Sequence, residues 1–378
     1  MNRFAIVLLF GLVPASIIRA EDDEWVGQIL FPRSNGVQVR DKDGKEITKW
    51  TLSAAKVLKE KKDSLLVRLG QPAGPAEGYV KKEDVVNLVE AATFYSDKVK
   101  QDEKDTWARL CRGQVWSLVE DYDKAIKDFD EVIQLDPKNA SAFTNRAAAW
   151  FGKEEFDKAI KDYDEAIKIN PKAADAFIGR GQTRASKQEY DKAIDDYTEA
   201  IKINPKYFEA FIARGEAWNE KKEYDKAIKD LDEAVRLDPK SASAFNGRAR
   251  VWYARQEYEK AIKDYTQAIK LDAEQDDALN GLAWLLATCP QAKYRDGKRA
   301  VELATKACEV SEWEEAGYID TLAASYAETG DFDKAIKYEK QAIELLTEEE
   351  EKRLGDEFRA RLKLFEQKKP FHEPEKKE

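Results

Sequence analysis

The pattern of apolar and polar residues divides the chain into two parts. Residues 25–88 contain short apolar runs separated by turn signals, such as Trp25–Leu30 and Leu65–Leu69, and a breaker-rich loop at Gln71–Pro75. About five short strands in this stretch predict a small β-barrel. From Asp84 onwards the apolar residues recur at helical spacing, so the rest of the chain is predicted to be α-helical.

An aromatic-Asp-Lys-Ala-Ile phrase recurs through the helical part. Its copies begin at Tyr122, Phe156, Tyr190, Tyr224, Tyr258 (where Glu259 replaces the aspartate) and Phe332. The first five copies are 34 residues apart. A fixed period of this length is typical of solenoids that are built from helix–turn–helix repeats.

Other residues recur in phase with this phrase. Small residues recur in the first helix of each period, at Gly113, Ala147, Gly181, Gly215 and Ala249, and in the second helix, at Ala125, Ala159, Ala193, Ala227 and Ala261. Large residues follow in the second helix, at Phe129, Tyr163, Tyr197, Leu231 and Tyr265. Small residues opposite large ones predict two antiparallel helices that interlock. Proline cannot continue a helix, and the second helices are followed by Pro137, Pro171, Pro205 and Pro239.

These columns closely resemble those of the tetratricopeptide repeat family. The resemblance implies an α-α superhelical solenoid of seven repeats, at residues 106–139, 140–173, 174–207, 208–241, 242–275, 276–315 and 316–349. The sixth repeat carries an insertion between its helices, at Cys289–Gly297. A connecting helix is predicted at residues 89–105, a capping helix at 350–367 and a disordered tail at 368–378.

The β part has a resemblance of its own. Gly78-Tyr79-Val80, followed by a turn and the apolar Val85-Val86, resembles the end of a bacterial SH3-like domain. The predicted fold class is therefore mainly α, with a small all-β SH3-like barrel at residues 21–88 ahead of the solenoid. No Gly/Ser- or Pro-rich tether separates the two parts, so we expect them to have a fixed relative orientation.

Two charged columns depart from the common family pattern. Arginines precede the small residue of the first helix, at Arg112, Arg146, Arg180, Arg214 and Arg248, and aspartates recur in the second helix, at Asp128, Asp162, Asp196, Asp230 and Asp264. Both columns are lost together in the sixth and seventh repeats. Because a guanidinium binds a carboxylate through two parallel hydrogen bonds, the joint loss predicts an internal ion-pair ladder. The alternative is a row of arginines that faces an acidic or phosphorylated ligand.

The first helices also supply candidate ligand contacts. In the tetratricopeptide repeat family these helices line a concave groove, which commonly holds an extended peptide or a helix. The residues opposite the core columns are the groove candidates: Asn145, Gln182, Glu216, Asn219, Asn246, Arg250, Tyr253, Asn280 and Trp284. This polar set with an aromatic end suits main-chain hydrogen bonding and an anchor pocket. The alternative is that each is an ordinary solvated helix residue.

The N-terminus resembles an export signal. Arg3 is followed by the apolar run Phe4–Val13, and Ala20 precedes an acidic stretch. Residues 1–20 are therefore predicted to be a signal peptide of an exported, periplasmic or secreted protein. The alternative is an uncleaved membrane anchor. The chain has three cysteines, Cys111, Cys289 and Cys308, and an exported protein held by disulfides would have more of them, in an even number. We therefore expect free, buried thiols, and a Cys289–Cys308 disulfide is the alternative.

Charge and chemistry limit the function. The formal net charge of -10 and the lack of a basic stripe argue against a nucleic-acid partner. His372 is the only histidine, and no nucleophile elbow, phosphate loop or Cys/His metal cluster is present, so no enzyme, cofactor or metal is predicted. A hydrolase built on barrel carboxylates is a remote alternative.

The leading hypothesis is a non-catalytic scaffold of the cell envelope that binds a protein or peptide in the solenoid groove. An alternative hypothesis gives the main role to the SH3-like domain. That domain would bind cell wall (peptidoglycan), with the solenoid as a spacer. The sequence does not name the partner in either case.

Overall fold

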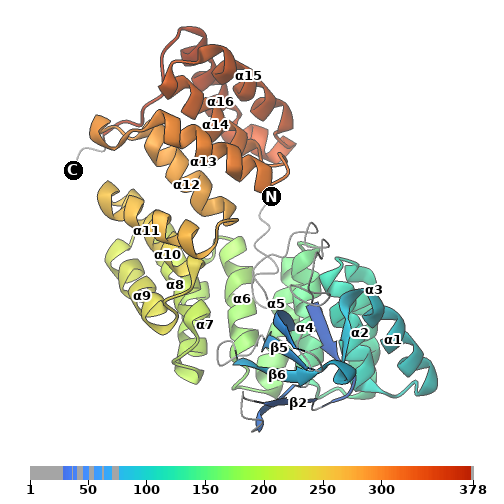
Figure 1. The fold of residues 1–378 in the computed structure, drawn as a ribbon. Helices are drawn as coiled ribbons and strands as arrows, with labels where there is room; N and C mark the ends of the chain where they lie inside the picture. Colours follow the sequence, from blue (N-terminus) through green and yellow to red (C-terminus); the bar gives the residue numbers. More distant parts are fainter. Residues whose placement is uncertain are drawn as a thin grey trace. The chain divides into compact units, whose positions relative to one another are not determined.

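The computed structural model describes residues 29–35, 37–40, 46–50, 55–61, 64–69 and 76–375. These residues belong to two compact units, residues 1–217 and 218–378, and each unit is considered by itself. Figure 1 shows the order of the elements in each unit. The predicted signal peptide at residues 1–20 lies outside the described residues.

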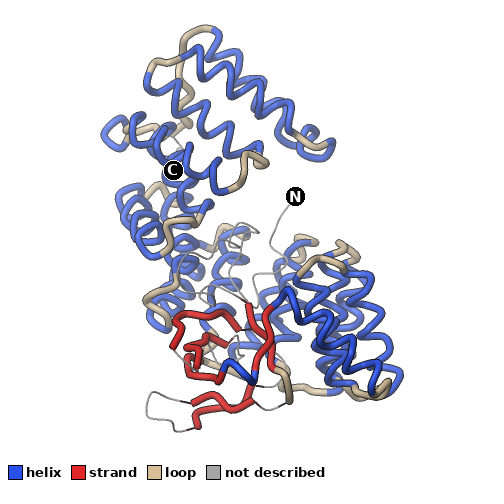
Figure 2. The backbone as a smooth tube through the Cα atoms, turned by 45° about the vertical axis from the view of Figure 1, so that its right-hand side comes forward, coloured by secondary structure: helices blue, strands red, loops and turns tan. Residues whose placement is uncertain are grey.

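A single antiparallel sheet opens the described chain (red in Figure 2). Its strands are β1 (Ile29–Pro32), β2 (Val37–Arg40), β3 (Glu46–Trp50), β4 (Ala55–Lys61), β5 (Ser64–Leu69), β6 (Ala76–Lys81) and β7 (Val85–Asn87), in the order β3-β2-β6-β5-β4-β1-β7. A 3-10 turn, η2 (Lys82–Asp84), connects β6 to β7. Among the described pairings none joins β3 to β7, so closure into an SH3-like barrel stays a prediction.

Helix α1 (Leu88–Gln101) joins this sheet to the repeats without a tether. Its Tyr95 is fully buried, and the hydroxyl donates a 2.6 Å hydrogen bond to the carbonyl of Pro32 on β1. The same ring meets Phe31 from the sheet and Trp107 from the next helix, both edge-on. A shared core therefore connects the β part to the first repeat.

Pairs of helices make up the repeats. The first unit contains α2 (Thr106–Leu118), α3 (Tyr122–Leu135), α4 (Ala140–Gly152), α5 (Phe156–Ile169), α6 (Ala174–Ser186) and α7 (Tyr190–Ile203), and the boundary between the units falls within α8 (Phe208–Glu220). The second contains α9 (Tyr224–Leu237), α10 (Ala242–Ala254), α11 (Tyr258–Leu271), α12 (Asp276–Thr288), η3 (Ala292–Tyr294), α13 (Gly297–Val310), α14 (Ala316–Thr329), α15 (Phe332–Leu345) and α16 (Glu348–Glu366). The insertion predicted in the sixth repeat is the segment around η3.

The turn inside each of the first five repeats has the same backbone form. One non-glycine residue adopts a left-handed conformation there, with φ between 60° and 62°, at Glu120, Glu154, Gln188, Lys222 and Gln256. The next amide then reaches back to the first helix, as when Asp121 donates to Trp116. The Asp121 carboxylate in turn caps the second helix by accepting from the amide of Lys124.

The small-and-large columns pack as interlocking surfaces. A Cβ added at Gly113 would lie 2.4 Å from the ring of Phe129, and one at Gly181 would lie 2.6 Å from Tyr197. The alanines of the second helices are fully buried, Ala125 and Ala159 among them. These glycines are therefore required by close approach of an aromatic ring and not by backbone conformation.

Candidate binding surface

Four predicted arginine–aspartate pairs lie within one repeat in the structure. Arg112 binds Asp128 with Nε and Nη2, at 2.8 and 2.5 Å. Arg146 binds Asp162 in the same way, with both distances at 2.7 Å, and Arg248 binds Asp264 at 2.7 and 2.9 Å. Arg180 is paired with Asp196. The fifth predicted pair, Arg214 with Asp230, has its members in different units and stays a prediction.

Four arginines, Arg146, Arg180, Arg214 and Arg248, also contact the preceding repeat through a residue 16 positions earlier. Arg146 Nη1 donates to Asp130 at 2.5 Å, and Arg248 Nη1 donates to Asp232 at 2.7 Å. Arg180 Nη1 donates a hydrogen bond to Asp164, and Arg214 Nη1 donates one to Thr198. The arginine column therefore joins neighbouring repeats. This second partner was missed, although Asp130, Asp164, Thr198 and Asp232 also recur every 34 residues in the sequence.

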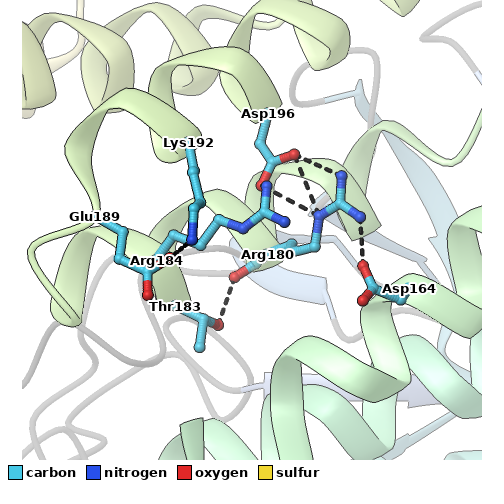
Figure 3. Close-up of polar contacts among 8 residues, drawn as sticks. Asp164, Arg180, Thr183, Arg184, Glu189, Lys192 and Asp196 are labelled. Carbon is cyan, nitrogen blue, oxygen red and sulfur yellow. Dashed lines mark hydrogen bonds and ion pairs between the residues drawn. The ribbon is translucent and has the colours of Figure 1, made fainter. Parts of the chain in front are cut away.

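The third repeat shows the most connected part of this ladder (Figure 3). Arg184 stands where the first, second, fourth and fifth repeats have a column of tryptophans, Trp116, Trp150, Trp218 and Trp252. Its Nη1 donates to Asp196 at 2.8 Å. Asp196 thus accepts from two guanidinium groups, Arg180 and Arg184. Burial raises the pKa of Asp196 above its ordinary value, while the two arginines act against that rise. Arg184 therefore breaks the tryptophan column because it supplies a second counter-charge to a buried carboxylate.

The ladder arginines are committed to internal contacts. Their side chains are only 15–19% exposed in the four pairs. The guanidinium groups of Arg146, Arg180 and Arg248 also lie over the phenylalanine three residues earlier in the sequence, as Arg146 does over Phe143. Such arginines have few donors left for an acidic ligand, so the geometry favours the ladder over the ligand-facing row.

The candidate groove residues fall into two groups by burial. Asn145 on α4, Gln182 on α6, Glu216 and Asn219 on α8, and Asn280 on α12 are half-buried. Asn246 on α10 is only 6% exposed, so its assignment to an open groove needs correction. Asn246 is one of the buried residues of α10, together with Ala244, Gly247 and Ala249. Its Oδ1, like that of Asn219 and Asn280, is buried and has no hydrogen-bond partner among the described residues.

Three candidates lie on the first helices of the second unit. Arg250 on α10 is 4.0 Å from the carboxylate of Glu220. Trp284 on α12 donates a hydrogen bond to Glu373, a residue of the tail that was predicted to be disordered. Burial raises the pKa of Tyr253 on α10, and the Glu373 carboxylate adds to that rise, so Glu373 lies close to both aromatic residues.

The predicted disordered tail is corrected by these contacts. The indole Nε1 of Trp284 donates to Glu373 at 2.9 Å, and the amide of Glu373 donates to the carbonyl of Thr288 at 2.8 Å. The ring of Phe371 lies 5.9 Å from that of Trp284, and His372 Nε2 lies 2.7 Å from the carboxylate of Glu328 on α14. The prediction of disorder for residues 368–378 is therefore wrong for the described residues 368–375, which contact α12 through Phe371 and Glu373.

A buried charge cluster lies beside the tail. Arg361 on α16 donates to Asp320 on α14 at 2.6 Å, and its guanidinium lies over the rings of Trp284, Phe358 and Phe371. Glu339 on α15 is fully buried beside it, 3.9 Å from Arg361. Burial raises the pKa of Glu339 to about 10, with the Asp320 charge as the next cause. Burial and the nearby Asp320 charge therefore favour the protonated form of Glu339, whose carboxyl oxygens have no hydrogen-bond partner among the described residues.

The thiols are unreactive by environment. Cys111, Cys289 and Cys308 are free and buried, as predicted. Burial raises the pKa of Cys308 to about 12 and also raises the pKa of Cys111 and Cys289. No group of His, Cys, Asp and Glu in the described chain could hold a metal ion. Within the same residues, every helix is too short or too polar to cross a membrane.

Comparisons with known proteins agree with this geometry. Tetratricopeptide repeat family models match residues 117–139, 140–173, 174–207, 220–278 and 317–345. A search of curated proteins found no match.

Two solved structures are similar in fold. Yeast Tom70 has a TM-score of 0.55 at 20% identity, over 74% of this chain and 59% of its own. Cut9–Hcn1, an APC/C hetero-tetramer, has a TM-score of 0.56 at 14% identity, over 68% of this chain and 50% of that one. This chain therefore spans little more than half the length of either structure. The chain is mainly α-helical and carries tetratricopeptide repeats.

Proposed function

We propose that the protein is a non-catalytic scaffold that binds a segment of another protein on the first helices of its repeats. The observation that carries this proposal is the tail segment on α12. A non-helical stretch, Phe371–Glu373, is held there through one main-chain hydrogen bond, one indole N–H and one aromatic contact. On such a surface the main-chain hydrogen bond fixes the register of a bound peptide, and the indole and aromatic contacts anchor its side chains.

The repeat fold supports the same proposal. The ladder arginines fix the helix pairs of the first, second, third and fifth repeats, and glycine–aromatic contacts add to this, so the first helices of these repeats present a preformed surface. Preformed surfaces lose little conformational entropy on binding. The Cut9–Hcn1 structure is a hetero-tetramer, so a chain of related fold takes part in a protein assembly.

The proposed location is the cell envelope. It rests on the sequence of residues 1–20, in which a short apolar run follows Arg3 and precedes a small residue and an acidic stretch. The three free, buried thiols, Cys111, Cys289 and Cys308, are compatible with this location.

Site-specific photo-crosslinking in the native host tests the proposal. A photoreactive residue is placed at Asn145, Gln182 or Arg250, which lie on first helices, and the matched controls carry it at exposed Lys127, Lys161 or Lys229 on second helices. We expect protein adducts from the first-helix positions alone. Equal adducts from both sets, or none from the first-helix set, would contradict the proposal. Co-purification with cell wall instead of protein would support the alternative role of the β part.

A further inference from the structure

We propose that the segment Phe371–Glu373 is an intramolecular ligand, and that the partner supplies a segment of the same chemistry, an aromatic residue followed two positions later by an acidic one. This inference rests on the proposed function and names the kind of segment that the surface accepts. The surface is called the α12 face below, and it consists of Tyr253, Trp284, Thr288, Glu328 and Arg361.

The main chain of the tail is held by a hydrogen bond to the carbonyl of Thr288, at the C-terminal end of α12. The last four carbonyls of a helix have no amide to accept from within the helix. Those of Leu285 and Leu286 accept from the amides of Cys289 and Asp296, and that of Thr288 accepts from Glu373. Any peptide can donate such a hydrogen bond, so this contact fixes the register of a segment and leaves its sequence open.

The side-chain contacts supply the selectivity. The carboxylate of Glu373 accepts from the indole N–H of Trp284, and an amide oxygen there would make a weaker bond because it carries no charge. Phe371 lies against Trp284 and under the guanidinium of Arg361, whose centre is 5.5 Å from its ring. An aromatic ring between an indole and a cation is favoured over an aliphatic side chain.

The tail is held by a short connection and a small contact area. The left-handed residue Lys368, with φ of 56°, turns the chain back after α16, and the amide of Lys369 donates to the carbonyl of Leu364. Phe371, His372 and Glu373 all remain half-buried. A short tether gives the tail an effective concentration in the millimolar range, so a weak contact is enough to keep the face occupied. A partner must therefore compete with the tail for the α12 face.

Peptide binding to the full chain tests this competition. The probe is a fluorescently labelled peptide with the sequence of residues 368–378, and its binding is followed by fluorescence anisotropy. The wild-type chain is compared with the double variant Phe371→Ala, Glu373→Ala, which empties the face and keeps the chain at full length. We expect the probe to bind the double variant about tenfold more tightly than the wild type.

Two controls separate the α12 face from other sites. Adding Trp284→Phe to the double variant keeps an aromatic ring and removes the indole N–H. The original probe should lose more affinity from this substitution than it loses, on the double variant, when its own residue at the Glu373 position is replaced by glutamine. A probe with alanine at both key positions should not bind.

Equal binding of the probe to the wild type and the double variant would overturn the inference. So would no binding to a double variant whose circular dichroism matches the wild type. If the probe fails while photo-crosslinks from Asn145 and Gln182 persist, the inference is wrong and the scaffold proposal stands. If the probe binds and crosslinks from Asn145, Gln182 and Arg250 are all absent, the tail is a local cap and the scaffold proposal is wrong.

Discussion

The Nε of Arg361 on α16 donates to the Oδ1 of Asp320 on α14 over 2.6 Å, inside a site where both side chains are almost completely buried. Glu339 on α15 lies against this pair. One arginine therefore neutralises a buried carboxylate and, through its flat face, supports Trp284 and Phe371. The end of the repeat array and the α12 face share this residue.

Arg361→Met should destabilise the last helices strongly. The substitution keeps the volume but leaves Asp320 buried without its counter-charge, which costs about 3–5 kcal/mol in comparable buried pairs. The measurement is amide hydrogen exchange in α14, α15 and α16. Arg359→Met is the matched control, since Arg359 lies on the same helix and pairs with Glu351 and Asp356 at the surface. A similar loss of protection in both variants would contradict the role of Arg361.

Glu339→Gln should change how stability depends on pH. The folded pKa of Glu339 is raised to about 10 by burial, so the folded state holds a proton that the unfolded state releases above its ordinary pKa. The sign follows: stability falls as pH rises between the two values, by up to about 1.4 kcal/mol per pH unit. The glutamine variant removes this titration, and its exchange protection in α15 should vary less between pH 5 and 9. Parallel pH profiles for the two proteins would contradict this account.

Arg146→Lys should weaken two repeats at once. Lysine keeps the charge but loses the two parallel hydrogen bonds to Asp162, and its single ammonium cannot also reach Asp130. A loss of about 1.5–3 kcal/mol is expected, because hydrogen bonds to charged groups are of this size. Hydrogen exchange should rise in both α3 and α5. Lys153→Met is the control, because Lys153 forms a surface ion pair with Asp123, whose side chain is 82% exposed, and the substitution should change stability little.

Gly113→Ala should destabilise the first repeat by about 1–3 kcal/mol, since its new methyl group would overlap the ring of Phe129. Gly317→Ala is the opposite case, because nothing lies within 4 Å of a Cβ there and alanine is the better helix former. We expect a small gain in thermal midpoint for Gly317→Ala and a clear loss for Gly113→Ala. Equal changes in thermal midpoint for the two variants would mean that the Phe129 ring does not restrict the side chain at position 113.

The repeated part of the molecule could be predicted because each contact occurs several times. The 34-residue period places Arg146 and Asp162 in matching columns, and their joint loss in later repeats indicates a pair. The second partner, Asp130, carries the same period and could have been found by testing other offsets. The sequence pattern thus contains more of the ladder than the single pairing that was predicted.

Contacts that occur once could not be predicted in this way. Glu339 stands in the column that holds Phe129 and Tyr163 in earlier repeats, and a charge in an apolar column is a signal that it is buried and paired. Nothing in the sequence relates it to Arg361 or Asp320, which belong to other helices. The tail was predicted to be disordered, whereas Phe371 and Glu373 contact Trp284 on α12, a pairing that occurs once and has no repeating pattern to reveal it.

The bond between Trp284 and Glu373 spans 89 residues of sequence. At a synthesis rate of roughly 5 to 20 residues per second, Glu373 is made roughly 4 to 18 seconds after Trp284. Helices α10 and α12 are complete before the segment that covers them exists. Every new molecule therefore passes through a period in which Tyr253, Trp284 and Thr288 have been made and the tail segment that contacts them has not.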